Sequence, residues 1–187
     1  MMEPVEFFEK YKKEIYSVAE FICSKDSSKN IEEEFENMKK QYYKKIGTGS
    51  KEIVILENGN IKYNISSILD EIRYSEVENT LVYIFFDGKY KRIQCEKGTR
   101  FNSSFNIELI EYMLIQFLKQ KKNISLYFVH NHPFIYRASM SQADENAVVY
   151  IVSRINYLRN MFVESTIDVL DFAVVTYYDY YSMKQEV

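Results

Sequence analysis

Cysteine is scarce in this sequence, and the two cysteines present stand far apart. Cys23 and Cys95 are the only ones among 187 residues, and neither belongs to a Cys-x-x-Cys pair. This excludes a disulfide framework and a cysteine-rich zinc knuckle. Any metal site in the chain must therefore be built from other ligands.

Long apolar runs and an excess of positive charge are also missing. The start of the chain, MMEPVEFFEKYKKEIYSVAEF, interleaves apolar and charged side chains, unlike a signal peptide, and no later run reaches membrane-spanning length. We therefore expect a cytoplasmic protein with no membrane partner. The net charge of -3 gives no general attraction for a polyanion, which makes nucleic acid an unfavoured partner.

The composition is that of a folded protein. Apolar residues make up 47% and charged residues 27%, and the length fits one domain with an extension. Residues 1–50 are predicted to form a helical extension, because apolar side chains recur at helical spacing over 3–22 and again over about 30–46. The glycines of GTGS at 47–50 suit a helix end and mark the expected boundary.

Residues 51–187 alternate between strand and helix patterns. A hairpin is predicted around Asn58-Gly59 and a second pair of strands is predicted to meet at Asp87-Gly88. The remaining predicted elements are helices over 66–74, 106–122 and 141–161, a buried strand over 125–129 and a closing strand over 168–176. This order predicts an α/β fold, with a mixed sheet flanked by helices.

The two histidines of the chain, His130 and His132, directly follow the predicted strand at 125–129. Side chains two residues apart in an extended backbone point to the same face, so both imidazoles can converge on one metal ion. Pro133 lacks an N–H and ends the strand, which leaves the pair at its rim. A histidine pair of this kind also occurs as a purely structural or exposed feature.

A catalytic zinc ion takes a third protein ligand of histidine or carboxylate type. The nearest candidate is Asp144, in the Ser-x-x-Asp pattern at 141–144, and Ser141 could then bond the metal water or a substrate oxygen. The same pattern is that of an ordinary helix cap, in which Ser141 caps the helix and Asp144 favours its positive end. Both interpretations are open at this stage.

The order of these motifs resembles that of a known family. HNHP at 130–133 followed by Ser-x-x-Asp is similar to the JAMM motif of the JAB/MPN metallo-hydrolases, and its wording resembles the RadC branch. EKGT at 96–99 is similar to a step that precedes the histidine strand in RadC proteins. LDFAVV at 170–175 and YYSM at 180–183 are similar to the family's closing strand and tail, so the resemblance covers about 74–187.

The resemblance implies a JAB/MPN (cytidine-deaminase-like) domain over 51–187 that binds Zn²⁺ through His130, His132 and Asp144. It also implies hydrolysis of an amide or isopeptide bond by metal-activated water, with a peptide or protein conjugate as substrate. The sequence departs from the family at Phe172, where a histidine is usual, and in the loop 134–140, which is one residue longer and lacks Gly/Pro character. Residues 1–73 also lack the helix-hairpin-helix extension of RadC proteins.

The family mechanism needs a glutamate on an earlier strand, which accepts a proton from the attacking water and later passes it to the leaving amine. By position, the candidate is Glu78. Asn79 falls on this position if the alignment slips by one residue, and Glu76 or Glu96 could then supply the acid. Each of these glutamates could instead be an exposed charge at a strand end.

Two other functions fit the sequence. A DNA-associated accessory protein without peptidase activity could use the basic aromatic segment KKQYYKK at 39–45, although lysines on a helix usually form its solvated face. If no glutamate reaches the metal, the fold could serve as an interaction module whose N-terminal helices dock a partner or a second copy. Such apolar helix stripes more often cover the protein's own sheet.

Overall fold

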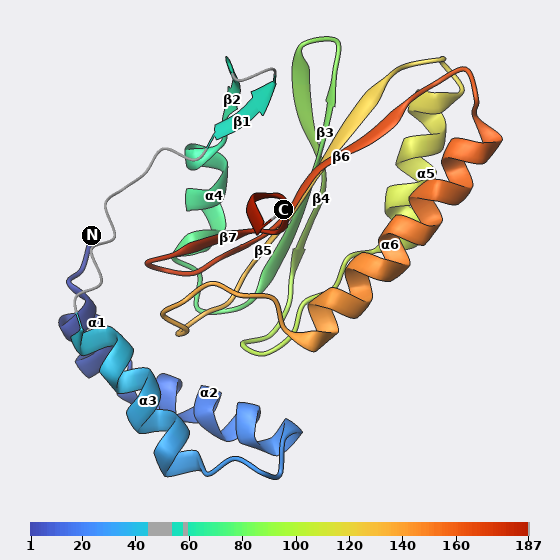
Figure 1. The fold of residues 1–187 in the computed structure, drawn as a ribbon. Coiled ribbons are helices and arrows are strands. Elements are labelled where there is room, and N and C mark those ends of the chain that lie inside the picture. The colour runs from blue at the N-terminus through green and yellow to red at the C-terminus, as the bar shows by residue number, and fades with distance from the viewer. Residues whose placement is uncertain (45–53, 58–59, 187) are drawn as a thin grey trace.

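The chain folds around one mixed five-stranded sheet in a computed structural model that describes residues 1–44, 54–57 and 60–186 (Figure 1). The strand order is β4-β3-β5-β6-β7; β5 and β6 run parallel, and the other neighbours are antiparallel. The strands are β3 (Asn79–Phe86), β4 (Lys89–Lys97), β5 (Ile124–Asn131), β6 (Ile167–Val175) and β7 (Tyr180–Ser182). The predicted mixed sheet flanked by helices is thereby confirmed.

The inner strands are buried because helices cover both faces of the sheet. β3 and β5 are near-continuous apolar runs, as strands covered on both faces require. The edge strand β4 begins with exposed charged residues, which discourage pairing with another chain. β3 and β4 meet at Asp87 and Gly88, both with positive φ, which is the conformation of a two-residue hairpin turn. The predicted turn is confirmed.

Two helices cover one face of the sheet and a shorter one covers the other (Figure 1). α5 (Ile107–Leu118) and α6 (Gln142–Met161) enclose a large apolar core against residues such as Val82, Leu126 and Phe128. α4 (Ser66–Arg73) packs a smaller core on the opposite face, around Leu81 and Val129. No helix in the described part of the chain is long and apolar enough to cross a membrane.

The N-terminal helices are α1 (Pro4–Lys10), α2 (Lys12–Lys25) and α3 (Ile31–Tyr43). The prediction of one helix over 3–22 is therefore wrong: the chain kinks at Tyr11, whose ψ of 24° lies outside the helical range while its ring packs on Phe134. The apolar spacing continues through this kink, so periodicity alone does not reveal it.

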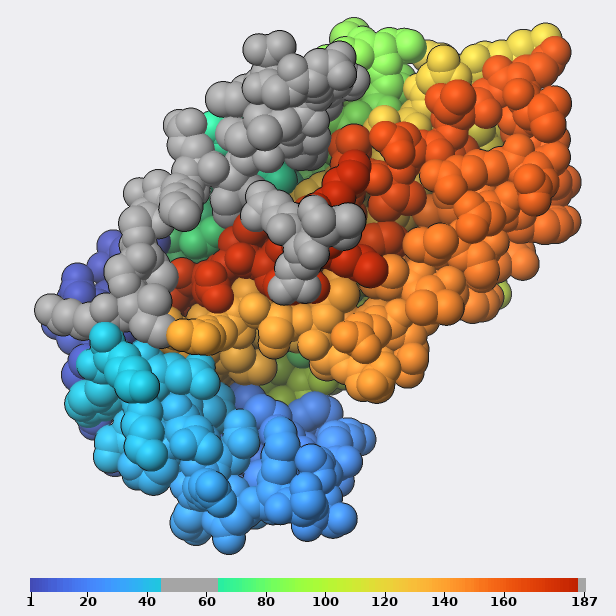
Figure 2. All heavy atoms as spheres, viewed as in Figure 1, coloured from blue at the N-terminus to red at the C-terminus, as the bar shows by residue number. Residues whose placement is uncertain are grey.

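These three helices do not cover the sheet. They form a third core with aromatic residues from the loop after β5 and the turn after β6, namely Phe134, Tyr136 and Tyr178. Figure 2 shows them, coloured blue to cyan, against the orange loop at one end of the molecule. The expectation that their apolar stripes cover the sheet is corrected accordingly.

Two further expectations concern the ends of elements. β1 (Val54–Glu57) and β2 (Asn60–Asn64) pair antiparallel, as predicted, whereas the turn at 58–59 and the GTGS segment at 47–50 lie outside the described residues. The helix predicted over 106–122 ends at Leu118, because Lys121 turns the chain with a φ of 55°. Lys122 therefore lies beyond the last helical turn, and its Nζ atom pairs with Asp87 at 2.6 Å.

Candidate metal centre

The two histidines lie where β5 ends. His130 belongs to the last part of β5, pairs with Thr80 of β3 and Val174 of β6, and is 5% exposed. His132 follows just beyond and is 9% exposed. Its backbone N–H donates to the Val175 carbonyl oxygen at 3.0 Å. Extended backbone puts both rings on one face, and their Nε2 atoms lie 3.0 Å apart.

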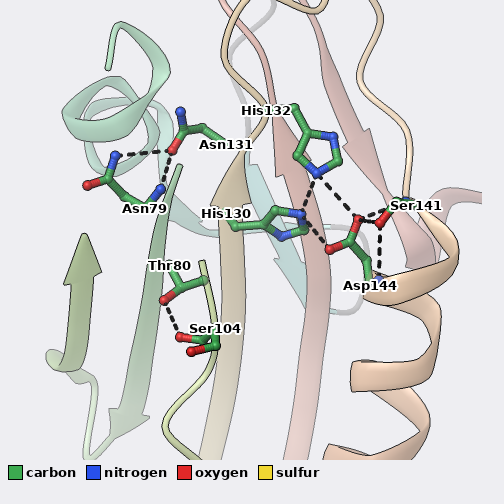
Figure 3. Close-up of polar contacts among 8 residues, drawn as sticks. All are labelled: Asn79, Thr80, Ser104, His130, Asn131, His132, Ser141 and Asp144. Atoms are coloured by element: carbon green, nitrogen blue, oxygen red, sulfur yellow. Dashed lines mark hydrogen bonds and ion pairs between the residues drawn. The ribbon is translucent and has the colours of Figure 1, made fainter. Parts of the chain in front are cut away.

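Asp144 brings a carboxylate to the two imidazoles from the first turn of α6 (Figure 3). Its Oδ1 atom lies 3.1 Å from Nε2 of His130, and its Oδ2 atom lies 3.3 Å from Nε2 of His132. One ligand atom from each of the three residues lies within 4.8 Å of the other two. This buried His-His-Asp group could hold a metal ion.

Ser141 and Asp144 also form a complete capping box. The Ser141 hydroxyl accepts the Asp144 N–H at 3.2 Å, and the Ser141 N–H and hydroxyl both donate to Asp144 Oδ2 at 2.7 Å. The capping and ligand interpretations therefore describe the same residues at once, because the cap fixes the orientation of the carboxylate that faces the histidines. Ser141 contacts the Asp144 carboxylate and also lines the adjoining cavity.

The electrostatics of Asp144 suit a ligand that must be ionised. Burial raises the pKa of its carboxyl, but hydrogen bonds and charge interactions with His130 and His132 lower it by more, so the pKa lies well below the ordinary value. Metal ions bind carboxylates in this ionised form. The Asp144 carboxylate is therefore ionised, and able to bind a metal ion, across the neutral pH range.

The three groups lie close enough together to share one small ion. Ligand atoms about 2 Å from such an ion lie about 3.3 Å from one another. The two Nε2 atoms lie 3.0 Å apart, and each lies 3.1 or 3.3 Å from a different oxygen of the Asp144 carboxylate. Two imidazole nitrogens and one carboxylate oxygen also form a typical catalytic ligand set, which leaves a fourth position for water. The residues present therefore fit a metal ion.

Glu78 lies beside this group, at the same end of the sheet. It lines the same cavity as His130, His132 and Asp144. The pKa of Glu78 is raised to about 7, chiefly by burial and also by the nearby Asp144 carboxylate. Interaction with His132 and a hydrogen bond from the Ser103 backbone act in the opposite direction and lower this pKa. A carboxyl group with this pKa can gain and lose a proton near neutrality, as a general base and acid requires.

The other residues considered for this role lie elsewhere. Glu76 is exposed and lines a separate, smaller pocket beside Pro133 and Tyr177. Glu96 accepts a hydrogen bond from Gln94 and does not line the cavity. Asn79 directs its side chain to Asn131 and Ser75 instead. Of these candidates, only Glu78 faces the metal-binding group.

Sequence reasoning missed the role of Asn131, between the two histidines. Alternation along β5 turns its side chain away from theirs, and it is 0% exposed (Figure 3). Its Oδ1 atom accepts the Asn79 N–H at 2.8 Å, and its Nδ2 donates to the Val77 carbonyl oxygen at 3.1 Å. These bonds hold the backbone on both sides of Glu78. The signal available was a polar residue in an otherwise apolar strand.

The loop between β4 and α5 completes the site. The Glu78 N–H donates to the Thr99 carbonyl oxygen at 2.7 Å, and the Gly98 N–H donates to the Glu78 carbonyl oxygen at 2.8 Å. A Cβ atom at position 98 would overlap the Asn102 carbonyl oxygen, so only glycine allows this loop to fold back tightly. The loop then lines a cavity of about 310 Å³ at the histidines.

The departures from the family pattern have structural counterparts. Phe172 stacks on Phe128 at 4.6 Å between ring centroids and belongs to the apolar core under α5 and α6. In the loop 134–140, Phe134 and Tyr136 pack against the N-terminal helices, and Tyr42 of α3 donates to the Phe134 carbonyl oxygen at 2.8 Å. The unusual loop is therefore the anchor of the helical extension.

Comparison of the sequence with models of protein families and with curated proteins gives no match. The likeness to RadC and the wider JAB/MPN family rests on the motifs alone and stays a prediction.

Proposed function

We propose that this protein is a zinc-dependent hydrolase of the JAB/MPN type, akin to the RadC branch, that cleaves an amide or isopeptide bond in a peptide or protein conjugate. The observation that carries the proposal is the convergence of His130, His132 and Asp144 on a cavity that Glu78 also lines. A three-ligand group beside a separate carboxyl of raised pKa provides the parts that metal-dependent amide hydrolysis needs.

Each residue has a defined task in this scheme. When bound, zinc supplies a Lewis acid that acidifies a water molecule and polarises the scissile carbonyl. Ionised Glu78 accepts the proton of the attacking water and, once protonated, donates it to the leaving amine. The pKa of about 7 makes both forms accessible near neutral pH. Ser141 holds the Asp144 carboxylate in the ligating orientation.

The cavity supports an amide substrate over a nucleic-acid one. None of the residues that line it is lysine or arginine, while Glu78 and Asp144 contribute two carboxylates. The cavity therefore lacks the basic side chains that usually contact phosphate groups. In the basic segment of α3, Tyr42 is 0% exposed and cannot stack on a base, and the half-exposed Tyr43 packs on Phe8 and donates its hydroxyl to Glu9. These observations count against the DNA-associated alternative.

The interaction-module alternative has less support for a similar reason. The apolar stripes of α1, α2 and α3 are used within the chain, against one another and against the loop that follows the histidines. Buried stripes offer no surface to a partner. The helical extension thus supports the site rather than replacing its function.

The first experiment is to measure zinc by elemental mass spectrometry after zinc loading and dialysis. We expect about one zinc per chain in the unmodified protein and none in His130→Ala/His132→Ala, with unchanged far-UV circular dichroism. A peptide and isopeptide screen with the loaded protein follows. Absence of zinc in the unmodified protein would overturn the proposal.

Asp144→Ala and Glu145→Ala form the matched pair for the third ligand. Both acids lie in the first turn of α6, but Glu145 is exposed and bonds only Gln142 among the contacts described. Asp144→Ala should lose zinc and Glu145→Ala should retain it. Equal retention by both variants would remove Asp144 from the ligand set.

A further inference from the structure

The cavity at the metal-binding group has a second, apolar part. Beyond the ligands and Glu78, it is lined by side chains from the β4–α5 loop, the start of α5 and the second and third turns of α6. The apolar lining residues are Phe101, Phe105, Ile107, Ala143, Ala147, Tyr150 and Ile151, and uncharged polar groups come from Thr80, Asn102, Ser103 and Ser104. Any molecule that fills this space also touches the groups that perform the chemistry.

The apolar wall is built into the fold on the sheet side. The Phe105 ring meets Phe128 at 5.6 Å and His130 at 6.3 Å, in both cases edge to face. Ile151 is 2% exposed and belongs to the main core. Because these side chains are fixed by close-packed neighbours, the wall keeps its shape without a ligand.

The outer wall depends on the N-terminal extension. The Phe101 ring stacks on Phe21 of α2, with centroids 4.8 Å apart and planes 11° apart. Arg100 lies over the Phe134 ring at 5.2 Å, beside the same helices. Residues far apart in sequence therefore cooperate to hold the loop that carries Phe101. In Figure 1 this loop lies at the end of the sheet nearest to the N-terminal helices.

Size and charge together define what the space can take. A volume of about 310 Å³ is near the lower limit for small-molecule sites, which run from about 300 to 1,000 Å³. This is room for one large side chain with its neighbouring peptide groups. The lining has no lysine or arginine to pair with an acidic side chain, and its aromatic and aliphatic residues offer apolar surface beside a few uncharged polar groups.

We infer that this cavity is a specificity pocket for a large apolar side chain, of the phenylalanine or leucine class, next to the scissile amide. The inference rests on the proposed hydrolase function for its reaction, but the pocket itself needs no metal. Burying such a side chain contributes about 1.5–3 kcal/mol, or about 10- to 100-fold in affinity. The protein therefore selects peptides by the residue beside the cleaved bond.

The catalytic test uses peptides that differ only in the residue beside the cleaved bond: phenylalanine, leucine, glycine, aspartate or lysine. The zinc-loaded protein should cleave the phenylalanine and leucine peptides with kcat/KM at least tenfold above the glycine peptide. Ala147→Leu fills the cavity and should lower the phenylalanine-to-glycine ratio about tenfold. Val149→Leu, on the exposed side of α6, should leave the ratio unchanged. Equal rates for all peptides would overturn the inference.

The binding test separates this inference from the hydrolase proposal. Metal-free protein is titrated with acetyl-phenylalanine amide and acetyl-glycine amide while backbone NMR shifts are recorded. Only the phenylalanine compound should shift the resonances of residues 101–107 and 147–151, and Ala147→Leu should abolish that effect. Such binding without cleavage of any peptide would reject the proposed hydrolase and keep the pocket. Absence of binding in the metal-free protein would overturn the pocket.

Discussion

The Asn131 side-chain oxygen accepts the Asn79 backbone N–H at 2.8 Å. This bond ties the residue between the two histidines to the segment that carries Glu78. The Asn131 amide group also donates to Val77 at 3.1 Å, so both neighbours of Glu78 are fixed by one side chain. The histidines and Asn131 alternate along one short extended segment. The same segment thus presents the candidate ligands on one face and fixes the backbone around Glu78 from the other.

Asn131→Ala should lower kcat more than it lowers zinc binding. The exchange removes two hydrogen bonds to the backbone around Glu78, which then no longer holds its place beside the ligands. We expect kcat to fall about 10- to 100-fold with zinc content unchanged. We also expect the free energy of unfolding to fall by about 1–3 kcal/mol. Asn146→Ala, at an exposed position of α6, is the control. Unchanged kcat and pH profile in a destabilised Asn131→Ala protein would assign Asn131 a purely structural role.

Glu78→Gln should abolish turnover, while Glu76→Gln should not. Glu76 lies two residues away but is exposed and lines a different pocket, so the pair differs in the role under test. Loss of a general base typically costs about 10²- to 10⁴-fold in kcat. Steady-state kinetics with equal zinc content in both variants provides the comparison. A greater loss of kcat in Glu76→Gln than in Glu78→Gln would identify Glu76 as the base instead.

Glu78→Gln should also stabilise the metal-free protein at neutral and higher pH. The pKa of Glu78 rises from 4.5 to about 7 on folding, so the folded state holds a proton that the unfolded state has lost between these values. Stability of the unmodified protein therefore falls as the pH rises through this window. Urea unfolding at pH 8 should show Glu78→Gln more stable by about 1 kcal/mol or more, with the difference vanishing below pH 4.5. A difference independent of pH would contradict this reasoning.

Ser141→Ala tests whether the helix cap and the metal ligand are coupled. Loss of the cap should cost about 1 kcal/mol of stability, and loss of the hydrogen bond to Asp144 should weaken zinc binding about 10- to 100-fold. Ser153→Ala is the control, because Ser153 lies in the middle of the same helix and bonds only Tyr150 among the described contacts. Zinc affinity equal to that of the control would separate the cap from the ligand.

Gly98→Ala should damage the site more than Gly88→Ala damages it. A Cβ atom at Gly98 overlaps the Asn102 carbonyl oxygen, so the loop beside Glu78 must shift. At Gly88 a Cβ atom meets nothing within 4 Å, and the cost is only that of the positive φ of 70°, about 1 kcal/mol. We expect kcat/KM to fall at least tenfold more in Gly98→Ala. Near-equal kinetics would show that the loop can relax without moving Glu78.

Patterns with a clear period or a specific turn were predictable from sequence. The apolar run of β5, the Asp87-Gly88 turn and the α6 helix were found where predicted, because each has a local physical cause. The kink at Tyr11 and the early end of α5 were missed. At both places helical spacing continues in the sequence while packing or a positive φ ends the helix.

The candidate site divides in the same way. His130, His132 and Asp144 could be proposed as one group because two short motifs imply their proximity. Glu78 was the candidate base by position, but Glu76 and Glu96 stayed open as alternatives, because the choice depends on which way the chain faces just before β3. Long-range hydrogen bonds from the β4–α5 loop and from Asn131 determine that direction.

The anchoring of α1, α2 and α3 on the histidine-to-aspartate loop has a consequence for biosynthesis. The Tyr42 hydroxyl finds its partner 92 residues later, and the Tyr178 hydroxyl bonds Met2 across 176 residues. During translation, the parts of the helices that pack on Phe134, Tyr136 and Tyr178 therefore have no partner until those residues have been synthesised. Docking of the helices and the final shape of the loop that joins the candidate ligands therefore depend on the same long-range contacts.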